Sequence, residues 1–202
     1  MIELKPPYDK VFDAQEHFRV LLDAMAHPGK LFPFSEVEMV GIPGIPHGIF
    51  YIAFALLNAD VHFTFLGPES ENAKTYITQN TSSLVSSLEM VDFVFFPGNL
   101  DGEFFRECKN GNLSYPEEGA SLVAYVDTLS TQKLDKSLEL SLKGPGVESI
   151  NTVYIQGLDI KSLEILKDIN SEFPLGLDLY VVDQNSTVMA IPRSNHLQFN
   201  TI

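Results

Sequence analysis

The sequence predicts an α/β fold with a mixed central sheet flanked by helices, organised as one domain over residues 1–202. Three observations lead to this prediction. Helical and strand-like segments alternate in the first half of the chain, which is typical of sheets covered by helices. The second half is a run of strand-like segments interrupted by one helical segment, so the sheet is expected to be mixed. No linker, internal repeat or low-complexity tract divides the chain.

The first predicted helix spans residues 13–29, where apolar side chains recur at helical spacing. Asp13 is of a type that caps helix starts, and Pro28-Gly29 ends the segment. Arg19 and Asp23 lie four residues apart and are placed to pair on its outer face. A proline- and glycine-rich loop is expected over residues 37–48. The other predicted helices are residues 49–59, which are apolar all round and therefore buried, 69–80, 101–111 and 162–173.

Strands are predicted where apolar residues alternate with polar ones or form short runs that end in turns. Residues 136–146 alternate most clearly, with Leu138, Leu140 and Leu142 on one face. Residues 177–183 and 186–192 are expected to form a hairpin through Gln184-Asn185. The predicted strand segments are 30–34, 61–68, 91–98, 115–129, 136–146, 151–157, 177–183 and 186–192.

Composition excludes several classes of function. The net charge is −14, so most of the surface repels nucleic acid and anionic lipid. A single cysteine, Cys108, allows no internal disulfide and no thiolate metal cage, and it is expected to pack in the core. The opening "MIELKPPYDK" does not resemble a signal peptide, and the longest apolar run is about half of a membrane span. We therefore expect a soluble, cytoplasmic protein that binds neither nucleic acid nor membrane.

Arg193 and His196 are the leading candidates for a functional site. Arg193 is one of only three arginines, and both residues follow Pro192, which ends a strand. Strand ends are where α/β folds bind ligands. A guanidinium suits phosphate or carboxylate, and an imidazole can transfer a proton. The alternative is a surface arginine beside a histidine that bonds a nearby carbonyl.

Two turns give weaker candidates. Gly144 and Gly146 in "LKGPGVES" allow a close backbone approach to an anion or a neighbouring subunit, or they simply end a strand. Glu117 and Glu118 precede a glycine; they could act as an acid–base pair, or be ordinary exposed acids.

Metal and cofactor motifs are not found in the sequence. The histidines show no metal-ligand spacing, and His47 and His62 are expected in the core because their surroundings are apolar. The sequence has no phosphate loop, no dinucleotide-binding motif, no nucleophile elbow and no lysine in a setting that argues for a Schiff base.

Five motifs occur in a fixed order: "FRVLLDAMAHPG", "PEEGASL", "LKGPGV", "FPLGLDLYVV" and "AIPRSNH". Together they resemble the PhnH family, the H subunit of the bacterial carbon–phosphorus lyase system. The resemblance spans about residues 13–199 and is strongest in the first helix and the last third. By matching motif it singles out a set of candidate ligand-binding or interface residues. These are Arg19, Glu117, Gly144, Gly146, Asp178, Arg193 and His196.

The resemblance implies further properties. The fold is expected to be similar to the large domain of pyridoxal-phosphate-dependent transferases, without the cofactor site, so no cofactor is expected. Family members form homodimers and join the G, I and J subunits in a larger complex. With ATP, that complex replaces adenine by an alkylphosphonate and forms ribose 1-phosphonate 5-triphosphate; the I subunit is thought to carry the nucleosidase chemistry.

Two functional hypotheses remain after the sequence analysis. The first is an accessory subunit of this complex, inactive alone, which binds partner subunits and has a further role open to it in presenting or shielding a phosphonate or nucleotide. The second is an enzyme in its own right, in which His196 is the acid–base and Arg193 holds a phosphoryl oxygen. The sequence favours the first, because an independent phosphoryl-transfer enzyme requires a dense cationic site, a metal cage or a phosphate loop.

Overall fold

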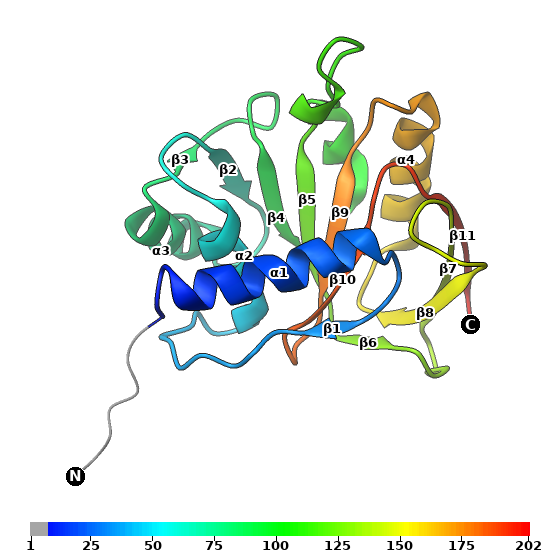
Figure 1. Cartoon of the computed structure of the whole chain (residues 1–202), viewed down its shortest axis with the longest axis horizontal. Helices are drawn as coiled ribbons and strands as arrows, with labels where there is room; N and C mark the ends of the chain where they lie inside the picture. The colour runs from blue at the N-terminus through cyan, green and yellow to red at the C-terminus, as the bar shows by residue number, and fades with distance from the viewer. Residues whose placement is uncertain (1–7) are drawn as a thin grey trace.

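The computed structural model describes residues 8–202 and contains two sheets (Figure 1). The larger sheet has seven strands in the order β1-β10-β9-β5-β4-β2-β3. Strands β3, β2, β4, β5 and β9 run parallel to one another, whereas β10 is antiparallel to both of its neighbours, β9 and β1. The strands are β1 (Phe32–Pro33), β2 (His62–Phe65), β3 (Leu84–Val85), β4 (Phe93–Pro97), β5 (Ser121–Tyr125), β9 (Asp178–Val182) and β10 (Thr187–Ile191). The prediction of an α/β fold with a mixed central sheet is confirmed.

Helices cover both faces of this sheet. Helix α1 (Phe12–Ala26) lies across one face in Figure 1 and packs, with α2 (His47–Leu56) and α3 (Ser70–Thr81), on an apolar core that includes Phe95 and Val123. Helix α4 (Ile160–Ile169) and the 3₁₀ helix Gly102–Glu107 belong to the core on the other face. Two further 3₁₀ helices span Pro116–Glu118 and Asn170–Glu172. All five predicted helical segments therefore contain a helix, one of them of the 3₁₀ type.

The sequence did not distinguish the strands of the smaller sheet from those of the central sheet. The smaller sheet is antiparallel, in the order β11-β7-β8-β6, and packs into the same core as α4. Its strands are β6 (Thr128–Ser130), β7 (Leu138–Lys143), β8 (Asn151–Gln156) and β11 (His196–Thr201). The predicted alternation is confirmed, since Leu138, Leu140 and Leu142 are all buried. Alternation identifies a face that is buried, but not the sheet to which the strand belongs.

The start of α1 differs from the prediction. The Oδ1 atom of Asp9, not of Asp13, accepts from the backbone amides of Val11 and Phe12, at 2.8 and 2.9 Å. Asp13 instead accepts from the amide of Asp9 at 2.7 Å. The pair expected between Arg19 and Asp23 is not formed; within residues 8–202 Arg19 has no ion pair. No helix in this range is long and apolar enough to cross a membrane.

Candidate functional site

The candidate residues gather at the edge of the sheet where the parallel strands begin, here called the amino edge. Asp178 is the first residue of β9, and Arg193 follows the last residue of β10 by two positions. Because β10 is antiparallel to β9, with Ile191 opposite Leu179, the end of one strand lies beside the start of the other. The short helix Pro116–Glu118, which leads into β5, lies at the same edge, at the top of Figure 1.

Arg193 is held by partners within the chain. Its Nε and Nη2 atoms donate to Oδ2 of Asp178 at 3.1 and 2.6 Å, and its backbone amide donates to Oδ1 at 2.8 Å. Nη1 donates to the carbonyl of Pro116 at 2.7 Å. The side chains of Arg193 and Asp178 are only 12% and 22% exposed. The pair therefore ties three segments together: the end of β10, the start of β9 and the turn before β5.

Gly119 belongs to the same arrangement. A Cβ atom at this position would lie 2.6 Å from Nη1 of Arg193 and 2.6 Å from the carbonyl oxygen of Gly176. Such contacts are too short for any side chain, so the guanidinium reaches Pro116 only because position 119 is a glycine. Glu117, one residue beyond Pro116, is exposed and lines a shallow cavity of about 390 Å³ with Asp178 and Arg193.

His196 is the first residue of β11, and its side chain is exposed. It lines a cavity of about 410 Å³ together with Arg193 and Lys167, and the remaining lining includes Asn170 and Ser194. The cavity thus collects two cationic side chains and an imidazole, which suits an anionic group. The sequence analysis missed Lys167, because it comes from α4 and no motif links it to Arg193.

The glycine turn contacts this chain itself. A Cβ at Gly144 would lie 2.9 Å from Nδ2 of Asn195, and one at Gly146 would lie 2.8 Å from Cδ of Pro28. Both glycines have positive φ, at 146° and 79°. Asn195 is buried and donates to the carbonyl of Pro145 at 3.2 Å. The close approach anticipated at these glycines is therefore made by the segment after Arg193 and by the residues that follow α1.

Arg19 lies apart from the other candidates. It is exposed on α1 and lines none of the three cavities near Arg193 and His196. The structure therefore brings Asp178, Arg193, Glu117 and His196 to one edge of the sheet, with the glycine turn beside His196. The position of these residues corrects one argument made from the sequence. Ligands of open α/β sheets bind outside the carboxyl ends of the strands, whereas these residues lie at the amino edge.

The buried histidine is not one of those predicted. His47 is exposed and His62 is partly exposed, whereas His17 is fully buried between Tyr51 and Phe34. Nε2 of His17 lies 3.0 Å from the carbonyl of Ser35, so this nitrogen carries the proton. Burial lowers the pKa of His17 below its usual value of 6.5. An amphipathic helix hides one face, and the position of His17 on α1 was the signal for its burial.

Cys108 packs in the core as predicted, and burial raises the pKa of its thiol to about 12. A thiol with so high a pKa stays protonated at neutral pH and is a poor nucleophile.

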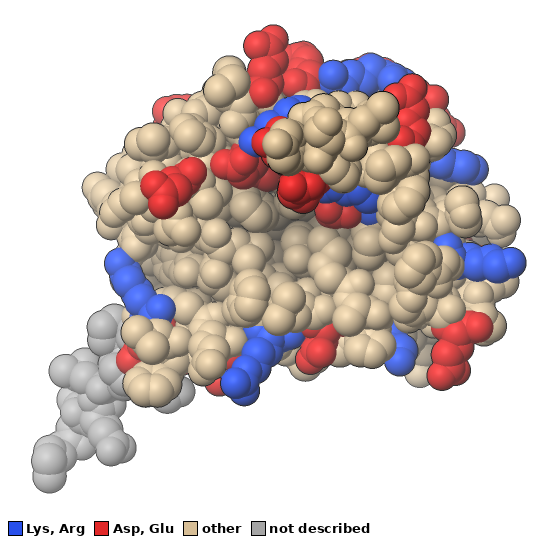
Figure 2. Space-filling view, turned by 45° about the horizontal axis from the view of Figure 1, so that its top comes forward, with Lys and Arg blue, Asp and Glu red and all other residues tan. Residues whose placement is uncertain are grey.

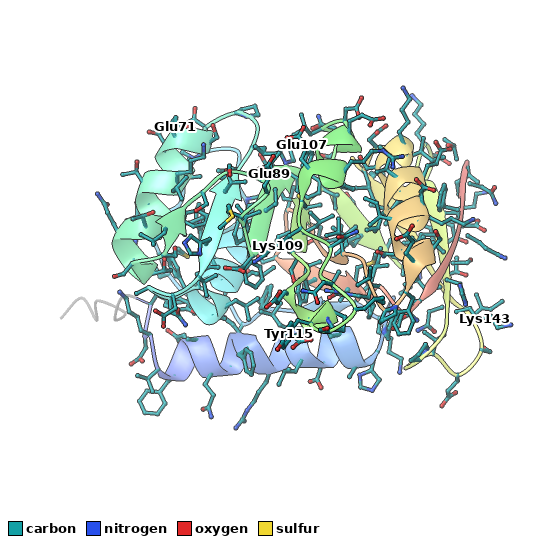
Figure 3. The ribbon with its side chains drawn as sticks, turned by 90° about the horizontal axis from the view of Figure 1, so that it is seen from above. Glu71, Glu89, Glu107, Lys109, Tyr115 and Lys143 are labelled. Atoms are coloured by element: carbon teal, nitrogen blue, oxygen red, sulfur yellow. The ribbon has the colours of Figure 1, made fainter. Side chains whose placement is uncertain are left out.

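Figure 3 shows the amino edge from above, with Tyr115 on the side of α1 and Lys109 further from that helix. Nζ of Lys109 pairs with Asp92 at 2.5 Å, so this lysine too is engaged within the chain.

Comparison with known proteins supports the resemblance seen in the motifs. A family model described as "Bacterial phosphonate metabolism protein (PhnH)" matches residues 7–198. The chain is 28% identical over 195 residues to the alpha-D-ribose 1-methylphosphonate 5-triphosphate synthase subunit PhnH of Rhizobium meliloti (strain 1021), covering 94% of this chain and 92% of that protein. It is 25% identical over 183 residues to the putative C-P lyase subunit protein HtxG of Stutzerimonas stutzeri, covering 91% and 85%. The chain belongs to the PhnH family of bacterial phosphonate metabolism proteins.

Proposed function

We propose that this protein is an accessory subunit of a carbon–phosphorus lyase complex and is inactive alone. Family membership over residues 7–198 carries this proposal, and two relatives are named as subunits of such a complex or of the synthase. The geometry at the amino edge supports it, because three N–H donors of Arg193 are occupied by Asp178 and Pro116 rather than presented to a substrate.

The proposed partners are the G, I and J subunits, in the cytoplasm. The complex would replace the adenine of ATP by an alkylphosphonate, forming ribose 1-phosphonate 5-triphosphate and releasing adenine. In this scheme the present chain supports assembly, while the bond-breaking chemistry belongs to another subunit. Its fold is proposed to be similar to the large domain of pyridoxal-phosphate-dependent transferases, with no cofactor bound.

We also propose that the chain forms a homodimer, through α1. The apolar segment "GIPGIPHGIF" (residues 41–50) offers little surface for an interface, because Ile45, Ile49 and Phe50 are buried in the chain's own core. The exposed apolar side chains of α1 are a better surface, with Phe12 at 74% and Leu22 at 52% exposed. Figure 2 shows a hollow of mostly uncharged residues between α1 and the charged groups of the amino edge. Light scattering should give about twice the chain mass of 22.5 kDa at micromolar concentration, and a monomer would contradict the proposal.

A second candidate function rests on the cavity lined by Lys167, Arg193 and His196. A phosphonate or nucleotide phosphate would find the hydrogen-bond donors of Lys167 and His196 there, beside the guanidinium of Arg193, which already pairs with Asp178. On this reading the chain binds substrate itself, and as a stand-alone enzyme it would use His196 for proton transfer. Lys167 and His196 are exposed, so the cavity is open to solvent.

One experiment separates the two functions. The purified chain is incubated with ATP and methylphosphonate, alone and with the G, I and J subunits, and released adenine is measured. The accessory-subunit proposal expects no adenine from the chain alone, and co-purification of the four subunits. Adenine release by the chain alone that is lost in His196→Ala would instead support the enzyme. Failure to co-purify would remove the proposal of a complex subunit.

A further inference from the structure

Two cavities lie next to each other at the opposite edge of the sheet, where the parallel strands end. One, of about 600 Å³, lies between the loop before α2, the start of α2 and the β9–β10 turn. The other, of about 230 Å³, lies at the ends of β4 and β5. Gln184 lines both, and the loop contributes Ile45 to the first and Gly44 to the second. Together they form one groove across the strand ends, here called the carboxyl-edge groove.

Three acids line the carboxyl-edge groove: Glu36 and Glu38 in the larger cavity and Asp127 in the smaller. All three are exposed, and within residues 8–202 none forms an ion pair. No lysine or arginine of that part of the chain lines either cavity. A phosphonate or triphosphate would be repelled by these three carboxylates, whereas a guanidinium or ammonium group would find unoccupied carboxylate oxygens.

The apolar residues of the groove suggest a protein occupant. Val37, Ile45 and Pro46 line the larger cavity beside the two glutamates. Val40, in the same loop, is 80% exposed. Lysine and arginine place long aliphatic stems on apolar surface while their charged ends reach acids. An exposed apolar side chain within a rim of charged groups is the arrangement of protein interfaces.

The spacing of the acids indicates several cationic side chains rather than one ion. In the described residues, no three histidine, cysteine or acidic side chains converge closely enough to hold a metal ion. The acids instead follow the groove from the loop before α2 to the end of β5. An extended segment that carries more than one basic residue matches this arrangement.

We propose that the carboxyl-edge groove docks a loop rich in lysine or arginine from a partner subunit of the complex. The inference rests on the proposed function, because it takes its partner from that complex. It adds the surface and the chemistry of the contact: basic side chains of the partner pair with Glu36, Glu38 and Asp127, and their stems lie on the partly exposed Val37. The site is separate from the cationic cavity beside Arg193, which lies at the other edge of the sheet.

The test measures binding to the assembled G, I and J subunits immobilised on a sensor surface. The groove variant is Glu36→Gln/Glu38→Gln/Asp127→Asn, which removes three negative charges and keeps the side-chain shapes. The control is Glu89→Gln/Glu107→Gln/Glu164→Gln, which changes the net charge equally. All three control residues are exposed, and in Figure 3 Glu89 and Glu107 lie on the side of the molecule away from α1. Thermal melting checks that each variant is folded.

The groove variant is expected to bind about tenfold more weakly than the unaltered chain, with a flatter dependence of Kd on salt, because each exposed interfacial pair contributes modestly. The control is expected to change Kd by less than about twofold. If the triple variant is unstable, the double variant Glu36→Gln/Glu38→Gln replaces it and is expected to bind about threefold more weakly than the unaltered chain. Equal losses in groove variant and control, or none in either, would overturn the docking site while leaving the proposed function intact. If the unaltered chain does not bind, both are overturned.

Discussion

Replacing Arg193 by alanine should destabilise the fold strongly. The substitution removes two hydrogen bonds to Oδ2 of Asp178, at 3.1 and 2.6 Å, and one to the carbonyl of Pro116, at 2.7 Å. Asp178 keeps only the bond from the backbone amide of residue 193. A carboxylate that is 22% exposed is then left without its counter-charge. The perturbation therefore loosens the end of β10, the start of β9 and the turn before β5 at once.

The magnitude follows from the burial of the pair. Charge-assisted hydrogen bonds contribute about 1.5–3 kcal/mol each, and breaking a fully buried ion pair costs about 3–5 kcal/mol. Residual exposure lets water replace part of the lost interaction, so we expect the free energy of unfolding to fall by about 2–4 kcal/mol. For a chain of this length each kcal/mol corresponds to about 2–4 °C, so Tm should fall by about 4–16 °C.

Thermal and urea melting at pH 7 measure this effect. Arg106→Ala is the matched control, because Arg106 pairs with Asp168 at 3.0 Å and Glu103 at 3.6 Å while remaining 50% exposed. Its loss should cost less than about 1 kcal/mol. If Arg193→Ala melts within about 2 °C of the unaltered chain, or no lower than Arg106→Ala, the contacts of Arg193 with Asp178 and Pro116 do not stabilise the fold as argued. The sequence made Arg193 a leading candidate for a functional site, and its contacts in the structure predict a large contribution to folding as well.

Three further predictions follow from the same structure. His196→Ala should change the free energy of unfolding by less than about 0.5 kcal/mol, since the side chain is exposed, and growth on methylphosphonate as sole phosphorus source shows whether the residue serves function. Burial lowers the pKa of His17, so the contribution of the neutral side chain to stability is complete above pH 6.5 and is lost as pH falls from there toward the lowered pKa. When Tm is measured from pH 8 to pH 5, it should therefore fall more steeply for the unaltered chain than for His17→Gln. Gly146→Ala should lower Tm by several degrees, because φ is 79° and an added Cβ would press on Pro28. Gly44→Ala is the control and should lower Tm less, because Gly44 also has a positive φ but an added Cβ would meet no atom within 4 Å. Equal effects of the two substitutions would contradict the packing argument.

Much of the fold could be predicted because periodicity reports burial directly. The alternation of residues 138–142 and the apolar run of α2 both describe faces that pack in the structure. The pairing of β11 with β7 could not be predicted, since "HLQFNT" has one strongly buried residue, Leu197, and its edge position leaves Phe199 only partly buried and the other four residues exposed. Similarly, Asp9 rather than Asp13 caps α1, and both are acids at plausible distances from the first turn. Short-range patterns do not choose between such neighbours.

For the candidate site, the sequence identified the residues but not their partners. Arg193 and Asp178 are 15 residues apart and were proposed as separate ligand or interface residues, yet they bind each other. Arg193 and Asp178 come together only through the antiparallel register of β9 and β10, and that register cannot be read from the sequence. Lys167 and the carboxyl-edge groove were missed for the same reason, because each depends on which strand ends and helices become neighbours in space.

The five motifs singled out in the sequence contact one another in the structure. Arg193 of "AIPRSNH" binds Asp178 of "FPLGLDL" and reaches the turn of "PEEGASL" across Gly119. Asn195, two residues after Arg193, packs on the glycine turn of "LKGPGV". Gly146 of that turn lies against Ala26 and Pro28 at the end of α1. Motifs separated by up to about 170 residues are thus one continuous set of contacts within a single chain. Each of the five motifs therefore contributes at least one residue to packing within the chain. The specific interactions of this protein are then to be sought on surfaces that packing leaves open, the cationic cavity beside His196 and the acidic groove at the opposite edge.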